Sequence, residues 1–87
     1  MNYKIKFTKQ ATMDIKYLKK SHLVEKAKKI VEIIKEDPFS NPPPFEKLIG
    51  DLRGMYSRRL NIQHRLVYYV DEHTKTVKII RMWKHYR

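Results

Sequence analysis

Residues 55–70 read MYSRRLNIQHRLVYYV, and this stretch decides how the rest of the chain is arranged. It holds two runs, Tyr56–Leu60 and Arg65–Val70, whose aromatic and branched residues are typical of β-strands. The four residues between these runs are few enough for a hairpin. A third run of the same kind, Thr76–Trp83, follows after residues 71–75. The sequence therefore predicts three consecutive antiparallel strands.

The N-terminal part predicts one more strand and a helical hairpin. Residues 2–7 alternate polar with apolar side chains, which is the pattern of a half-buried strand. Thr8 is a suitable N-cap for a helix over residues 9–20, and Ser21 for a second helix that Pro38 ends. We expect an α+β fold: an antiparallel twisted sheet with the helix hairpin packed on one face and the other face open.

Residues 38–44, PFSNPPP, form a segment that we call the proline arm. Three successive prolines favour a stiff, extended chain. We interpret the arm as an ordered segment that brings Glu46 into position, and a plain spacer is the alternative. Gly50 and Gly54 follow it and indicate tight turns before the predicted strand at Tyr56.

The charge of the chain narrows its possible partners. At 87 residues the chain is expected to form one domain, residues 1–87, with 20 Lys and Arg against nine Asp and Glu, a net charge of +11. Such a domain attracts polyanions, nucleic acid above all, or an acidic protein; a lysine-rich solvated surface is the alternative. The chain has no cysteine and no apolar run long enough to span a membrane, which fits a cytoplasmic protein.

Several residue types needed to cleave RNA occur in the C-terminal half. Glu46 is a carboxylate among cations and could accept a proton, although a surface ion pair would look the same. Arg58, Arg59 and Arg65 offer planar donors matched to phosphate oxygens, and solvated arginines of a sheet are the alternative. The terminal pair His85–Tyr86 offers an acid–base group and a ring that stacks on bases, unless it is a frayed tail.

Other chemistries have little support in the sequence. The four histidines lack the spacing of metal ligands, and no glycine-rich phosphate loop or nucleophile elbow is present. A DNA-binding helix-turn-helix is conceivable because the helical hairpin is basic. Its apolar stripe is predicted to be buried, however, and its turn lacks the usual glycine.

Five segments together resemble the YoeB (Txe) family of toxins, within the wider RelE superfamily. They are Pro38–Phe39, Phe45–Leu48, Gly54–Leu60, His64–Tyr68 and His85–Tyr86, and they occur in the family's order at similar spacing. The resemblance covers nearly the whole chain. It implies a small RelE-like fold and the toxin of a type II toxin–antitoxin pair, which enters the ribosomal A site and cuts messenger RNA there without a metal or other cofactor.

The resemblance also implies a role for individual residues. Glu46 matches the family's general base, Arg65 its phosphate-stabilising arginine and His85 its general acid. Tyr86 matches the C-terminal aromatic residue, and Arg59 a supporting arginine. The expected partners are the ribosome with its message and a cognate acidic, YefM-like antitoxin; the toxin itself would be a monomer or a homodimer, and no membrane is involved.

The end of the chain departs from the family pattern. Arg87 follows the tyrosine, and Trp83–Lys84 stands where an arginine and a small or aromatic residue are expected. We count Arg58 and Lys84 as additional candidates for RNA binding. The alternative function is a basic module that binds RNA or the ribosome without cutting it.

Overall fold

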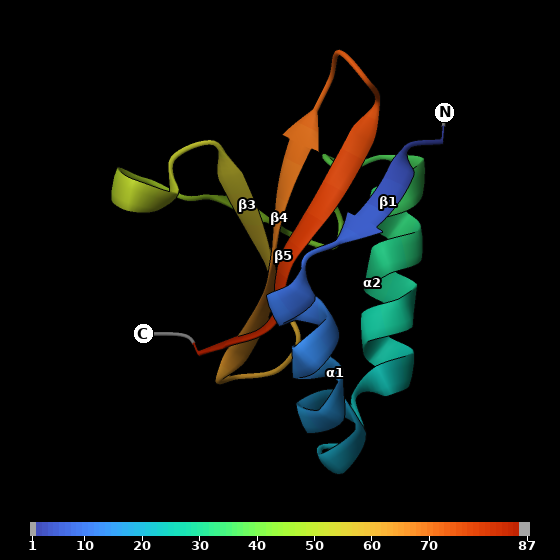
Figure 1. Ribbon diagram of the computed structural model, residues 1–87, viewed down its shortest axis with the longest axis vertical. Coiled ribbons are helices and arrows are strands. Elements are labelled where there is room, and N and C mark those ends of the chain that lie inside the picture. Colours follow the sequence, from blue (N-terminus) through green and yellow to red (C-terminus); the bar gives the residue numbers. More distant parts are fainter. Residues whose placement is uncertain (1, 86–87) are drawn as a thin grey trace.

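The computed structural model describes residues 2–85 as two helices packed against a five-stranded sheet (Figure 1). The strand order across the sheet is β1-β5-β4-β3-β2. In chain order the elements are β1 (Lys4–Phe7), α1 (Lys9–Lys20), α2 (Val24–Glu36), β2 (Glu46–Lys47), the 3₁₀ helix η1 (Gly50–Leu52), β3 (Met55–Arg59), β4 (His64–Asp71) and β5 (Thr76–His85).

The predicted α+β fold class is confirmed, but the sheet is mixed. The pairs β2–β3, β3–β4 and β4–β5 are antiparallel, whereas β1 runs parallel to β5, with Lys4 opposite Thr76 and Phe7 opposite Ile79. Parallel neighbours require a crossover, and here all the other elements of the chain form it. The two-residue strand β2 was not predicted, because its length is too short for a periodic pattern.

The helical hairpin differs from the prediction at its turn. Thr8 caps α1 as predicted, since its hydroxyl accepts the N–H of Ala11 at 3.0 Å. Ser21 does not cap α2: it ends α1, and its N–H donates to the carbonyl oxygen of Tyr17 at 3.0 Å. The chain then turns at His22, whose φ of 58° lies in the left-handed region. A histidine thus adopts the left-handed conformation that a glycine usually provides in such a turn.

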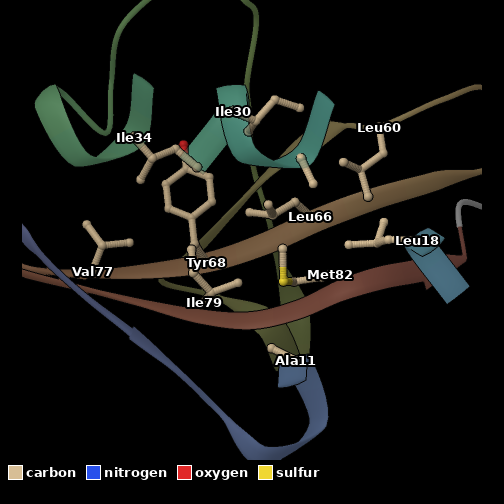
Figure 2. Close-up of a cluster of buried hydrophobic side chains, with 11 residues drawn as sticks. Ala11, Leu18, Ile30, Ile34, Leu60, Leu66, Tyr68, Val77, Ile79 and Met82 are labelled. Carbon is tan, nitrogen blue, oxygen red and sulfur yellow. The ribbon is translucent and has the colours of Figure 1, made fainter. Parts of the chain in front are cut away.

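The core lies between the helices and one face of the sheet (Figure 2). Ile30 and Ile34 of α2 pack with the apolar side chains of β4 and β5, and α1 contributes Ala11 and Leu18. The strand residues of this cluster are Leu66, Tyr68, Val77, Ile79 and Met82, and Leu60 joins it from just after β3. Side chains alternate between the two faces along β4. Leu66 and Tyr68 face the helices, so Arg65 and Val67 point to the opposite face of the sheet.

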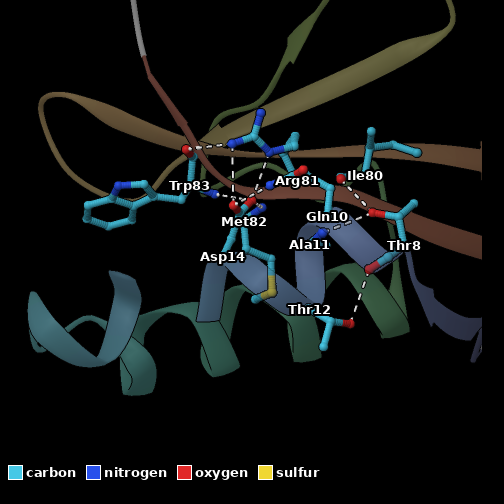
Figure 3. Close-up of polar contacts among 9 residues, drawn as sticks. All are labelled: Thr8, Gln10, Ala11, Thr12, Asp14, Ile80, Arg81, Met82 and Trp83. Carbon is cyan, nitrogen blue, oxygen red and sulfur yellow. Dashed lines mark hydrogen bonds and ion pairs between the residues drawn. The ribbon is translucent and has the colours of Figure 1, made fainter. Parts of the chain in front are cut away.

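A buried carboxylate anchors the second half of β5 to α1. Strand β1 pairs with β5 only as far as Ile79. Beyond that point Asp14 of α1, which is 0% exposed, accepts the N–H groups of Met82 at 2.9 Å and Trp83 at 3.2 Å (Figure 3). The same carboxylate pairs with Nε of Arg81 at 2.9 Å. Asp14 therefore takes the place of a neighbouring strand for this segment.

Candidate active site

Two strand pairings place four polar side chains on one face of the sheet. Glu46 lies opposite Ser57 in β3, and Arg59 lies opposite Arg65 in β4. Residues that face each other across strands share a side, and Ser57 and Arg59 are two positions apart, so all four point the same way. This side faces away from the helices, because Leu66, the neighbour of Arg65, belongs to the helix-facing core.

A short ion pair joins Arg65 to Glu46. One terminal nitrogen of Arg65 lies 2.5 Å from Oε1 of Glu46 and 2.7 Å from Oγ of Ser57. The arginine side chain is 9% exposed, whereas the glutamate side chain is 62% exposed. A guanidinium held in place from two sides needs little reordering to bind a phosphate. The carboxylate remains accessible, so the pair combines a fixed cation with a reachable proton acceptor.

The face that carries this pair is less open than the sequence led us to expect. Arg65 as a residue is 7% exposed and Ser57 is 1% exposed. Glu46 and Arg59 are the exposed members of the group. A ligand therefore meets the carboxylate and Arg59 first, and reaches Arg65 from beside Glu46.

Arg58 points to the opposite side and holds the proline arm. It is 2% exposed, and its terminal nitrogens donate to the carbonyl oxygens of Pro38 and Ser40 at 2.9 Å and of Pro43 at 2.6 Å. Its Nε donates to the hydroxyl of Tyr68 at 3.1 Å. The expectation that Arg58 binds RNA does not fit this burial. Arg58 instead fixes the arm to the sheet, and the arm leads directly into Glu46 at the start of β2.

We expect Arg58→Leu to destabilise the protein by at least about 3 kcal/mol, because hydrogen bonds from a charged donor contribute about 1.5–3 kcal/mol each and the variant loses those to Pro38, Ser40 and Pro43. Within residues 2–85, only the carbonyl oxygen of Pro38 keeps a second donor, the hydroxyl of Tyr68 at 2.8 Å. The midpoint and slope of urea unfolding give this free energy. Arg53→Leu is the matched control: Arg53 is exposed, and its loss should change stability by no more than about 0.5 kcal/mol. Equal midpoints for the two variants would contradict the assigned role.

A cleft of about 470 Å³ opens between α2, the proline arm and the edge of β3. Strand β2 covers that edge only at Ser57 and Tyr56, which leaves it uncovered further along. Lys26 and Lys29 of α2 form part of the wall, a role that the sequence did not reveal because both lie off the helix's apolar stripe. The residues lining the cleft are Lys26, Lys29, Ile30, Pro43, Pro44, Phe45, Glu46, Ser57, Arg58, Arg59 and Arg65.

His85, at the end of β5, lies against a stack of aromatic rings. It pairs with His64 across the sheet, and the two ring centroids are 5.2 Å apart in an edge-to-face arrangement. His64 stacks flat on Trp83 with centroids 3.7 Å apart, and Trp83 stacks on Tyr17 of α1 at 6.1 Å. This stack and the Asp14 cluster together fix the end of β5 against α1.

The strand pleat separates His85 from Arg65. His64 precedes Arg65 in β4, so their side chains point to opposite faces, and His85 lies on the side of His64. Lys84 lies opposite Arg65 and is exposed. The structure thus brings Glu46 together with Arg65 but leaves His85 at the end of its strand, towards α1. The predicted site residue Tyr86 lies outside the described residues.

His64 is a half-buried stacking ring in this arrangement. Burial lowers its pKa, and the nearby His85 lowers it further. Its Nδ1 atom is buried and has no hydrogen-bond partner within residues 2–85. Both observations favour the neutral imidazole, so His64 supports its neighbours through packing.

Two further features of the described residues concern metal binding and membrane insertion. Residues 2–85 contain no group of three or more histidine, cysteine, aspartate or glutamate side chains arranged to hold a metal ion. Along the same residues, no helix has both the length and the apolar content needed to cross a lipid bilayer.

Comparisons with known proteins identify the relatives of this chain. Residues 7–86 match the family of YoeB-like toxins of bacterial type II toxin–antitoxin systems. Toxin YoeB of Synechocystis sp. is 31% identical over 86 residues, which cover 97% of this chain and 98% of the relative. The heterotetrameric YoeB–YefM toxin–antitoxin complex from Staphylococcus aureus contains a chain that is 35% identical, with a TM-score of 0.79 and coverage of 99% and 100%. An archaeal RelE–RelB complex from Pyrococcus horikoshii is 25% identical, with a TM-score of 0.77 and coverage of 97% and 96%.

The fold and these similarities define a RelE-like toxin. The family match covers nearly the whole length, and the YoeB toxins are similar along the entire chain. The chain belongs to the YoeB-like toxins of bacterial type II toxin–antitoxin systems.

Proposed function

We propose that this toxin is a ribosome-dependent endoribonuclease that cuts messenger RNA in the ribosomal A site and thereby stops translation. The observation that carries the proposal is the contact between Glu46 and Arg65 on the exposed rim of the sheet. One hydrogen bond joins the two groups, and in the proposed reaction Glu46 accepts a proton while Arg65 binds the phosphate. Membership of the YoeB-like toxins supports the same conclusion.

The proposed reaction is an in-line transfer within the RNA. Glu46 takes the proton of a 2′-hydroxyl, whose oxygen attacks the adjacent phosphorus. The bond from phosphorus to the 5′ oxygen breaks, and His85 gives that oxygen a proton. The products are a 2′,3′-cyclic phosphate and a 5′-hydroxyl, and no metal or cofactor takes part. Arg65, with Arg59 beside it, stabilises the extra negative charge on the phosphate as it develops. Tyr86 and Lys84 are the proposed contacts to the flanking RNA.

The ribosome has a physical part in this scheme. A chain of 87 residues offers little surface for holding a flexible message in line, and correct alignment supplies a large share of the rate in such reactions. The structure adds a second reason: His85 lies on the far side of the pleat from Arg65. We propose that docking of the message in the A site brings the phosphate to the end of β5, where both groups reach it.

The proposal is tested with purified toxin and bacterial ribosomes programmed with one defined message. We expect cleavage at the codon in the A site, with 2′,3′-cyclic phosphate ends detected by their resistance to 3′-end labelling. His85→Ala should slow the cut by about 10²–10⁴-fold, the usual contribution of one acid or base. Stalled ribosomes that carry intact message would instead support the non-catalytic binding module.

We further propose that an acidic antitoxin covers the basic rim of this site. The related chain from Staphylococcus aureus is found with YefM, and the present chain carries a net charge of +11. We propose that the toxin works in the cytoplasm, where it would meet ribosomes. Adding the cognate antitoxin at saturating concentration should abolish cleavage, and undiminished cleavage would contradict this assignment.

A further inference from the structure

The cleft beside the Glu46–Arg65 pair has an unusual balance of charge. Its rim carries the exposed cations Lys26, Lys29 and Arg59. Glu46 is the one carboxylate among the described lining residues, and Arg65 already neutralises it. Among the described residues Lys26 and Lys29 have no carboxylate partner, so the α2 wall of the cleft presents unneutralised positive charge. A ligand that fits here carries negative charge.

One wall of the cleft is apolar and rigid. Phe45 follows the proline arm, and its ring packs against those of Phe39 and Tyr56, with both centroids 5.9 Å away. The guanidinium carbon of Arg58 lies 5.1 Å from the centre of the same ring. Because Arg58 is itself held by four hydrogen bonds, this wall is built before any ligand arrives.

Pro43 and Pro44 of the proline arm extend the same wall, and Ile30 of α2 adds a further apolar side chain to the lining of the cleft. A flat apolar surface next to cations suits a nucleotide, whose base has an apolar face and whose phosphate is an anion. The volume, about 470 Å³, is in the range of ordinary small-molecule sites. An acidic peptide would use the cations but would leave most of the apolar wall without a partner.

We propose that the cleft between α2 and the proline arm is a nucleotide subsite, in which the base next to the scissile phosphate packs against Phe45 and its phosphate binds Lys26 and Lys29. The proposal rests on the proposed function, because it assigns the place of RNA beside the Glu46–Arg65 pair. It adds α2 to the substrate-binding surface and makes its two lysines specific contacts.

Helix α2 provides its own matched control. Lys28 and Lys35 are exposed lysines of the same helix that do not line the cleft: Lys28 lies 3.9 Å from Glu25 and borders a separate apolar groove. The double variants K26A/K29A and K28A/K35A remove the same charge from the same helix. Only the first pair faces the cleft, and the ion pair that K28A removes is between two exposed side chains.

The direct test measures binding of a short single-stranded RNA whose 2′-hydroxyl at the cleavage position is methylated, so that it cannot be cut. For K26A/K29A we expect the slope of log affinity against log salt to fall by about 0.7 for each lost phosphate contact, with no such change for K28A/K35A. In the same RNA, an abasic residue beside the cleavage position should weaken binding to the unmodified toxin roughly 5- to 150-fold, as expected for loss of one stacked base. Thermal unfolding of both variants verifies that they are folded.

The outcomes separate this inference from the proposed function. If both double variants cut the message on programmed ribosomes equally fast and bind the RNA with equal affinity, the proposed subsite is wrong. The proposal that the toxin is a nuclease is then unaffected. If the unmodified toxin cuts no message, the nuclease proposal fails, and the salt slopes still decide whether RNA occupies the cleft. If K26A/K29A loses affinity only for an acidic antitoxin peptide, the occupant is protein and the nucleotide subsite is overturned.

Discussion

Glu46→Gln should lower the rate of message cleavage by about 10²–10⁴-fold while the protein remains folded. Glutamine has the shape of glutamate and can still accept a hydrogen bond from Arg65, which lies 2.5 Å from the carboxylate. It cannot take a proton from a 2′-hydroxyl. The loss should therefore appear in the single-turnover rate on programmed ribosomes, with little change in the affinity for them.

Glu36→Gln is the matched control, because Glu36 is an exposed carboxylate at the end of α2, outside the cleft. It should cut at the rate of the unmodified toxin. A rate for Glu46→Gln within tenfold of normal would remove Glu46 from the role of general base. The site would then depend on charge stabilisation by Arg65 alone.

Asp14→Ala should have the largest effect on stability, a loss of about 3–5 kcal/mol, the usual result of leaving one member of a buried ion pair alone. The carboxylate is 0% exposed and holds Arg81 together with the N–H groups of Met82 and Trp83. Without it, these donors lose their partner at a place where β1 no longer covers β5. Urea unfolding measures the loss, and Glu36→Ala, at an exposed site, should stay within about 0.5 kcal/mol.

The pH dependence of stability gives an independent test of the contribution of Asp14. Burial by itself raises the pKa of Asp14, but the hydrogen bonds from Arg81, Met82 and Gln10 outweigh it and lower the pKa below 3.8. A lowered folded-state pKa adds stability above the unfolded pKa, and that stability is lost as the pH falls through the folded value. The difference between the unmodified protein and Asp14→Asn should thus be constant near neutral pH and shrink below about pH 4. A difference in stability that did not change with pH would contradict the lowered pKa of Asp14.

The elements of the fold were predictable because each one is encoded locally. Apolar alternation and helical periodicity located the three C-terminal strands and both helices, and Thr8 marked the start of α1. The parallel pairing of β1 was not predictable, because it depends on which free edge of the sheet the first strand meets. Ser21 misled us for a related reason: serine suits either end of a helix, and the left-handed turn at His22 decided between them.

The candidate site, too, was predictable only in part. The contact between Glu46 and Arg65 follows from strand register, which a sequence specifies only when both strands are recognised, and β2 is two residues long. Arg58 and Arg59 are chemically identical, and only the pleat shows that one is buried beneath the proline arm. The inclusion of Lys26 in the cleft depends on where that arm lies, which no local pattern encodes.

The position of β5 also determines when the toxin becomes active during its own synthesis. Strand β5 is the last element in the chain, yet it lies between β1 and β4 in the sheet. Strand β1, made first, has no partner until Thr76 and the residues after it have left the ribosome. At about 5–20 residues per second, the interval between them lasts roughly 4–14 seconds. A nuclease directed at ribosomes, as proposed, would remain without a complete sheet throughout that time.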